Sequence, residues 1–87
     1  MYKIKFLDGT EKEFNTLERA DLFKADLFKA NLQGANLQGA DLQGANFQGA
    51  NLKDANLAQA QWYKANFAGA KFCNTMMPYN IRESSGC

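Results

Sequence analysis

The chemically reactive side chains of this 87-residue chain are few. It contains no histidine, which removes the usual general base and the commonest metal ligand. Two cysteines, Cys73 and Cys87, are too few to complete a zinc site. The sequence holds no phosphate-binding glycine loop, dinucleotide fingerprint or nucleophile elbow. We therefore expect no enzyme, no metal, no cofactor and no small-molecule substrate.

Three aspartates remain as candidates for acid–base chemistry: Asp21, Asp26 and Asp41. Their spacing is a multiple of five, and asparagine occupies the same phase at Asn31, Asn36 and Asn46. In a stacked repeat Asp21 and Asp41 would lie in one column and repel each other mildly. The aspartates are therefore predicted to form part of a solvated face.

A strict five-residue repeat in the sequence predicts the structural elements that position these residues. Alanine occupies every fifth position from Ala20 to Ala70, and Leu, Phe or Trp follows two residues after each alanine. Residues five apart on an α-helix are rotated by about 140°, so this pattern cannot form one apolar stripe. The period excludes a helix and favours short strands joined by corners.

One unit shows the expected local structure. Ala35 and Leu37 point to the inside of a strand and Asn36 to the outside, because strand side chains alternate. Gln38 and Gly39 then form the corner, with Gly39 in the positive-φ position of a type II turn. Glycine holds this position at Gly34, Gly39, Gly44, Gly49 and Gly69. Where it does not, we expect another turn type, at Arg19, Lys24, Lys29, Gln59 and Lys64.

Corners that turn the chain by about a right angle close a square after roughly four units. Successive squares stack at about 4.8 Å, so each residue lies beneath the one twenty positions later. The inward side chains then form four columns: Leu17, Leu37, Leu57 and Met77; Leu22, Leu42 and Trp62; Leu27, Phe47 and Phe67; Leu32, Leu52 and Phe72. We expect Ala40, Ala45 and Ala50 to be enclosed and Trp62 to be a core residue.

The motif Ala-(Asp/Asn)-Leu-x-x, repeated from Ala20 to Asn74, resembles the pentapeptide-repeat proteins. Residues 15–19 form a weaker unit before it, and Gln61 and Lys71 depart from the pattern. The ending, with residues 72–78 and 85–87, is similar to that of small cyanobacterial members. The resemblance implies an all-β fold, a right-handed quadrilateral β-helix (solenoid) of about three coils.

The chain is expected to form a single domain with three segments. Residues 1–14 are predicted to form a hairpin-like cap, because residues 2–6 alternate, Asp8-Gly9 is a hairpin signal and residues 12–14 can return. Residues 15–74 form the repeat, and residues 75–87 form a non-repeating tail. The aromatic side chains of the last coil and the tail are expected to cover the C-terminal end, since both ends of a solenoid need covers.

The sequence has no targeting signal and no apolar run long enough to span a bilayer. We therefore expect a cytoplasmic protein without membrane association. In a reducing cytosol Cys73 and Cys87 are predicted to be free thiols, and a disulfide that pins the tail is the alternative.

The best-studied function of the resembled family is imitation of duplex DNA by an acidic, rod-shaped dimer that binds DNA gyrase. Here ten Lys plus Arg oppose nine Asp plus Glu, for a formal net charge of +1. The repeat is expected to be only about 15 Å tall. Both features oppose DNA mimicry, which is the least favoured of the three candidate functions, after an interaction module and a purely structural unit. Direct nucleic-acid binding is also disfavoured, because the lysines are interspersed with acids.

Three aromatic residues interrupt the mostly polar corners: Phe23, Phe28 and Tyr63. Exposed aromatic side chains that lie close together mark a contact surface. Alternatively, the N-terminal hairpin covers Phe23 and Phe28. The sequence thus predicts a non-enzymatic protein-interaction or scaffold module with an unidentified protein partner, as a monomer or weak homodimer. A purely structural unit without a partner is the alternative.

Overall fold

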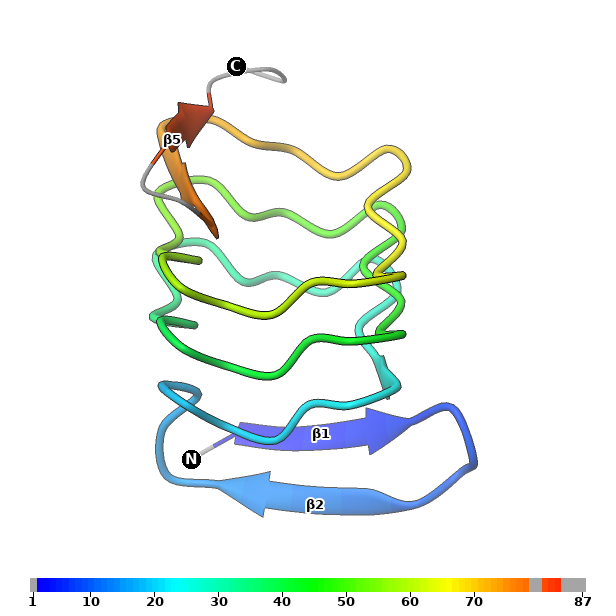
Figure 1. The fold of residues 1–87 in the computed structure, drawn as a ribbon. Coiled ribbons are helices and arrows are strands. Elements are labelled where there is room, and N and C mark those ends of the chain that lie inside the picture. The colour runs from blue at the N-terminus through cyan, green and yellow to red at the C-terminus, as the bar shows by residue number, and fades with distance from the viewer. Residues whose placement is uncertain (1, 79–80, 84–87) are drawn as a thin grey trace.

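The computed structural model describes residues 2–78 and 81–83, and these form a short tube of squared coils (Figure 1). The strands are β1 (Tyr2–Phe6), β2 (Glu11–Phe14), β3 (Ala25–Asp26), β4 (Thr75–Met77) and β5 (Ile81–Glu83). No α-helix is present in the described ranges. Correspondingly, a search of those ranges finds no helix with the length and apolarity to cross a membrane.

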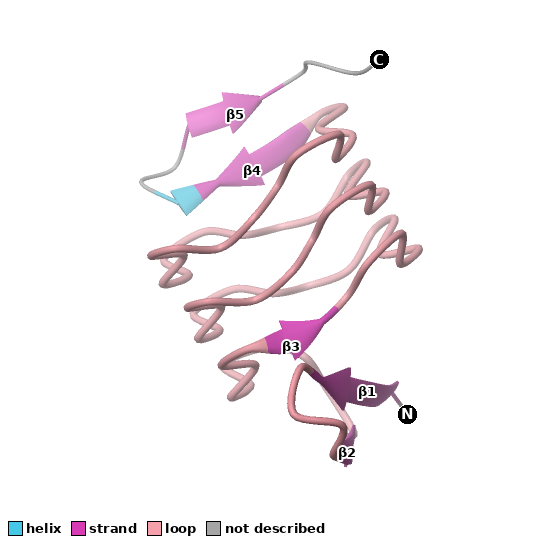
Figure 2. Cartoon of the chain, turned by 90° about the vertical axis from the view of Figure 1, so that its right-hand side faces the viewer, coloured by secondary structure: helices cyan, strands magenta, loops and turns pink. Residues whose placement is uncertain are grey.

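The coils repeat every twenty residues, as predicted. Parallel bridges join Asp21 to Asp41 and Asp41 to Gln61, and the same step recurs on the other faces of the tube. The Leu22 amide donates to the Asp41 carbonyl over 2.9 Å, and the Asp41 amide donates to the Ala20 carbonyl over 3.0 Å. A corner every five residues leaves room for little more than one bridging residue per face, so the stacked faces in Figure 2 are mostly not continuous strands.

The interior of the tube is filled by the predicted columns. Leu22, Leu42 and Phe47 are fully buried. Ala40 and Ala50 are 0% exposed and Ala45 is 1% exposed, which confirms that the alanine positions face inward. Each face therefore contributes one large and one small apolar side chain to the core.

Every corner of the repeat uses the same left-handed residue, whether or not it is glycine. At the corner after Leu22 the Ala25 amide donates to the Leu22 carbonyl over 2.9 Å, and Lys24, the third residue of that turn, has a φ of 57°. Gly44 in the coil above has a φ of 68°. The other non-glycine corner residues also have positive φ: Arg19, Lys29, Asp54, Gln59, Lys64 and Asn74. The expectation of another turn type at Arg19, Lys24, Lys29, Gln59 and Lys64 is wrong.

The backbone hydrogen bonds between successive coils explain why residues other than glycine are tolerated at these corners. A left-handed residue costs roughly 1–2 kcal/mol. The Lys24 amide donates to the Gln43 carbonyl over 2.9 Å, which fixes the corner to the next coil. The Asp21 carboxylate also accepts a hydrogen bond from the Phe23 amide over 3.2 Å, and Asn46 does the same for Gln48 over 2.9 Å. The outward Asp and Asn side chains thus brace the corners as Asx turns.

The glycine corners of the second coil leave room for long side chains from the coil below. A Cβ atom on Gly44 would lie 3.2 Å from Cγ of Lys24, and one on Gly39 would lie 3.1 Å from Cγ of Arg19. Gly34, in contrast, has no atom within 4 Å of that position. Part of the glycine content therefore reflects a close approach between coils as well as positive φ.

The N-terminal end is closed by the predicted hairpin. β1 pairs antiparallel with β2 on one side and with β3 of the first coil on the other. Ile4 and Phe6 are buried against the core. In the connecting turn, Thr10 donates to the Asp8 carboxylate from its hydroxyl over 2.6 Å and from its amide over 2.9 Å. These two bonds hold the pKa of Asp8 below its usual value.

At the other end the stacking register continues past Asn74. Asn56 forms a parallel bridge with Met76 in β4, and Met77 is buried in phase with Leu57. The Thr75 hydroxyl donates to the Leu52 carbonyl over 2.7 Å. β5 then pairs antiparallel with β4. The tail thus begins as part of the last coil, although its sequence no longer repeats.

Two expectations at this end are wrong. Trp62 is 36% exposed, because its column has no further coil stacked on it within the described residues; its ring lies 5.9 Å from that of Phe67. Phe67 in turn stacks on Phe47, with 4.9 Å between the ring centres.

Cys73 is disulfide-bonded, so it is not a free thiol. The other cysteine of the sequence, Cys87, lies outside the described residues.

Replacing Ala45 by Leu should destabilise the protein by about 1–3 kcal/mol, because the enclosed site has no room for three more carbon atoms. Chemical denaturation measures the change. Ala68→Leu is the matched control: Ala68 lies on an exposed corner, so its free energy of unfolding should change by no more than about 0.5 kcal/mol. Equal stability of the two variants would contradict the inward assignment.

Replacing Gly34 by Ala should cost about 1–2 kcal/mol through positive φ alone. Gly44→Ala should cost more, because the added Cβ must also displace the Lys24 side chain. Urea denaturation of the two variants separates these effects. A Gly34→Ala protein as stable as the parent would show that the left-handed conformation is not what glycine provides there.

Candidate functional site

The three aromatic side chains singled out from the sequence are all exposed. Phe23 is 48% exposed, Phe28 is 50% exposed and Tyr63 is 68% exposed. We call these three residues the aromatic corner surface. The alternative that the N-terminal hairpin covers Phe23 and Phe28 is wrong: the hairpin buries its own Ile4 and Phe6 against the core and leaves both rings accessible.

Two of the three residues lie on one edge of the tube. Phe23, Gln43 and Tyr63 form a single column, because the Lys24 amide donates to the Gln43 carbonyl over 2.9 Å and the Gly44 amide donates to the Tyr63 carbonyl over 3.0 Å. Phe23 and Tyr63 are therefore two coils, or about 10 Å, apart. Phe28 lies on the next corner, in the column of Gln48. The structure brings Phe23 and Tyr63 to one edge and sets Phe28 on the adjacent one.

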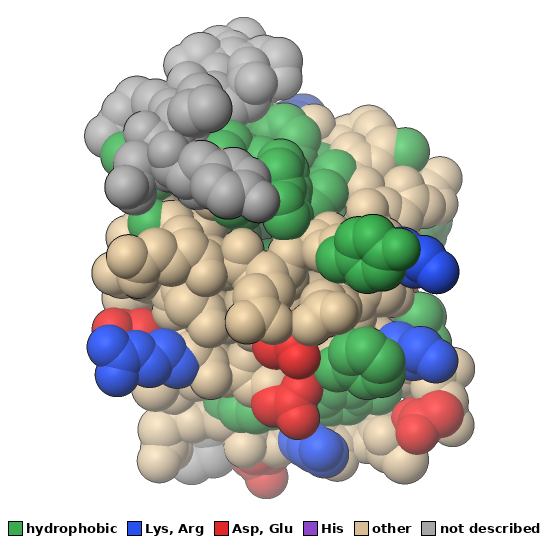
Figure 3. Space-filling model, in the orientation of Figure 1, with side chains coloured by type: hydrophobic (Ala, Val, Ile, Leu, Met, Phe, Trp, Pro, Cys, Tyr) green, Lys and Arg blue, Asp and Glu red, His purple; other side chains and the backbone are tan. Residues whose placement is uncertain are grey.

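The ammonium group of the next lysine in the sequence lies over each exposed ring. Nζ of Lys24 lies 5.4 Å from the centre of the Phe23 ring, and Nζ of Lys64 lies 5.4 Å from that of Tyr63. Lys29 and Phe28 repeat this arrangement at 5.3 Å. Such contacts contribute about 0.5–1 kcal/mol at exposed sites. Figure 3 shows hydrophobic groups with adjacent basic groups at two heights on one side of the molecule.

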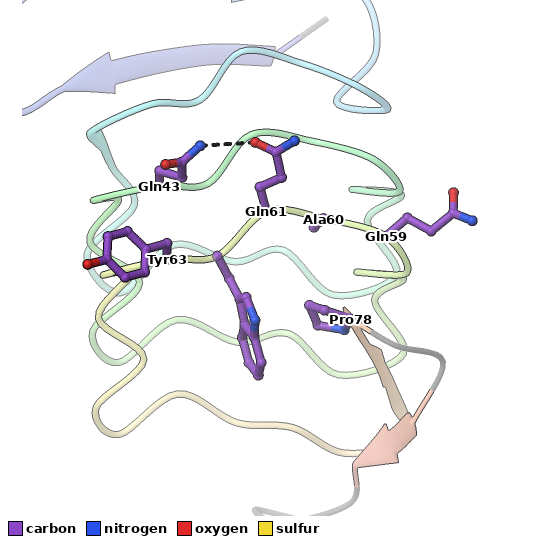
Figure 4. A pocket seen from close by; sticks show the side chains of 7 residues that line it. Gln43, Gln59, Ala60, Gln61, Tyr63 and Pro78 are labelled. Atoms are coloured by element: carbon purple, nitrogen blue, oxygen red, sulfur yellow. Dashed lines mark hydrogen bonds between the residues drawn. The ribbon is translucent and has the colours of Figure 1, made fainter.

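The structure adds a groove that the sequence did not reveal. It has a volume of about 610 Å³ and is lined by Gln43, Gln59, Ala60, Gln61, Trp62, Tyr63 and Pro78. In Figure 4 Gln43 and Gln61 lie side by side, with Tyr63 toward one end and Pro78 toward the other. Sequence reasoning assigned Trp62 to the core and so missed the groove. The available signal was the replacement of the usual Asp or Asn by Gln61 directly before two aromatic residues.

A smaller hollow of about 260 Å³ lies between the hairpin and the first coil. Phe6 and Phe23 line it together with charged side chains of both signs. Nζ of Lys12 lies 5.3 Å from the centre of the Phe6 ring. This hollow presents charges of both signs around two rings, whereas the lining of the larger groove, as far as the structure describes it, is uncharged.

The reactive side chains of the sequence are dispersed in the structure. Within residues 2–78 and 81–83, no three His, Cys, Asp or Glu side chains gather into a group that could hold a metal ion. Asp21 and Asp41 do stack in one column, joined by a backbone bridge, as expected. The features suited to recognition are thus the aromatic corner surface and the neutral groove beside it.

Comparison with known proteins agrees with this architecture. A family model described as pentapeptide repeats matches residues 20–59 and 50–78, with eight copies of the repeat. A search of curated proteins finds no match.

Among solved structures the chain is similar to HetL, a pentapeptide repeat protein involved in heterocyst differentiation regulation from the cyanobacterium Nostoc sp. strain PCC 7120. The TM-score is 0.59, the sequence identity is 33%, and the match covers 75% of this chain. It covers 33% of HetL, so this chain spans about a third of the length of that protein. On the match to the family model over most of its length, this all-β chain belongs to the pentapeptide repeat family and forms its right-handed β-helix.

Proposed function

We propose that this protein is a non-enzymatic interaction or scaffold module that contacts a protein partner through the aromatic corner surface. The observation that carries the proposal is the exposure of Phe23, Phe28 and Tyr63, at 48%, 50% and 68%. Gln43 and Gln48 occupy the same columns, so the fold itself does not need an aromatic side chain there. Exposed rings without a packing role are typical of contact surfaces.

The chemistry of the surface indicates what kind of partner would fit. Aromatic side chains commonly supply the residues that dominate a protein interface. Lys24, Lys29 and Lys64 lie against the three rings, so each contact point combines an apolar face with a positive charge. A partner with acidic side chains around apolar ones would complement it. The surface consists of three exposed side chains, which favours a transient complex over an obligate one.

The family relation supports the same class of function. HetL, which shares the repeat, is described as involved in regulation of heterocyst differentiation. For the present chain we propose a regulatory role, and we propose separately that it acts through protein contacts. We also propose a cytoplasmic location, and the disulfide at Cys73 is the feature of the structure that opposes it.

The alternative is a structural unit without a dedicated partner. It is favoured by the commitment of most side chains to the fold: the inward residues fill the core, and the outward Asp and Asn residues brace the corners. Among the described residues, the aromatic corner surface and the groove are the surfaces that we assign to recognition. The two functions therefore differ in one respect, which is whether the exposed rings bind anything.

A triple variant, Phe23→Gln, Phe28→Gln and Tyr63→Gln, tests the proposal. Glutamine already occupies these columns in the second coil, so the free energy of unfolding should fall by no more than about 0.5–1 kcal/mol per substitution, the contribution of the lost contact between lysine and ring. Partners captured by the parent from a lysate are identified, and each affinity is measured with purified proteins. We expect a loss on the order of tenfold or more for the true partner.

The matched control is Gln33→Ala with Gln38→Ala, on the two other corner columns. It should leave the affinity unchanged. Retention of every partner by the folded triple variant would leave the structural unit as the better account.

A further inference from the structure

We propose that the neutral groove beside Tyr63 binds a proline-rich segment of the partner in the polyproline II conformation. This inference rests on the proposed function, because it names the class of partner segment that an interaction module of this shape would take. It concerns a surface separate from Phe23 and Phe28, which do not line the groove.

The first support is the aromatic lining. Trp62 is 36% exposed and Tyr63 is 68% exposed, and both line the groove. Trp62 holds the place that leucine takes in the two coils below, so the repeat does not demand an indole there. Grooves lined by aromatic side chains are the sites at which proline-rich segments dock, because the pyrrolidine rings pack on the aromatic faces.

The second support is a pair of amide groups that line the groove, on Gln43 and Gln61. Gln43 donates from Nε2 to Oε1 of Gln61 over 2.9 Å, as the dashed line in Figure 4 marks. That bond uses one hydrogen of Gln43 and leaves both amide hydrogens of Gln61 available. A polyproline II segment has no internal hydrogen bonds, so its carbonyl oxygens need donors from the protein that binds it.

The third support is charge. None of the described residues that line the groove is ionised, although lysines are frequent elsewhere in the chain. Lys64 lies against the Tyr63 ring but does not line the groove. A site without charge suits a neutral segment better than an acidic peptide or a nucleic-acid backbone. The volume of about 610 Å³ lies within the usual range for a ligand site.

The segment also suits the groove energetically. A polyproline II segment is already extended before it binds, so it loses less conformational entropy than a flexible chain of the same length. This smaller loss of conformational entropy matters for a shallow site with few contacts. An amphipathic helix, in contrast, needs an apolar groove that accommodates several turns.

The test is titration of the parent protein with a deca-proline peptide. Trp62 is the only tryptophan of the chain, so its fluorescence reports directly on the groove. We expect a saturable change with deca-proline and none with a Gly-Ser peptide of equal length. Isothermal titration calorimetry then gives the affinity for each variant.

Trp62→Leu and Tyr63→Gln restore the residues that their columns carry in the second coil, so both should fold. Each should weaken binding of deca-proline on the order of tenfold. Phe23→Gln with Phe28→Gln is the matched control and should leave this affinity unchanged. Circular dichroism melting of every variant separates loss of binding from loss of fold.

The outcomes distinguish this inference from the proposed function. If deca-proline does not bind the parent, or binds the Trp62→Leu variant equally well, the inference is wrong. The proposed function is then tested separately by partner capture with the Phe23→Gln, Phe28→Gln variant, because neither residue lines the groove. Binding of a neutral oligosaccharide in the groove, with deca-proline inert, would also overturn it. Binding of deca-proline that is lost with Phe23 and Phe28 instead would place the site elsewhere.

Discussion

The structure depends on one repeated constraint, a corner residue with positive φ that is held to the next coil by backbone hydrogen bonds. At Lys24 the corner is closed by the bond from Ala25 to Leu22 and fixed by the bond from the Lys24 amide to the Gln43 carbonyl. Because a corner recurs every five residues, the chain closes a square and stacks in steps of twenty. The inward columns and the outward Asp and Asn braces follow from that geometry.

This constraint also determines which side chains are available for function. Most residues are assigned by the repeat to the core, to a corner or to a brace, so they cannot be recruited for recognition without loss of the fold. The exceptions are side chains whose columns carry a different residue in another coil, as at Phe23 and Tyr63, and side chains such as Trp62 on which no described coil stacks. Both proposals concern these exceptions.

Much of the fold could be predicted from the sequence because a strict period constrains every coil in the same way. The burial of Ala40 and the stacking of Asp21 under Asp41 follow from phase alone. The left-handed lysine corners could not be predicted, because the local preference against positive φ is overridden by bonds to the next coil. The exposure of Trp62, the groove and the disulfide at Cys73 depend on how the repeat ends, and a period carries no information about its own ends.

The central claim is that no described segment stacks on the face of the last coil that carries Trp62, which leaves this side chain accessible to a partner. The Leu42 amide donates to the Gln61 carbonyl over 2.7 Å, whereas the Trp62 amide, one coil above, has no acceptor among the described residues. Native-state hydrogen exchange of these two amides tests the claim most directly. The account predicts strong protection of Leu42 and fast exchange of Trp62. Equal protection of the two amides would show that another layer covers the edge and would contradict the account.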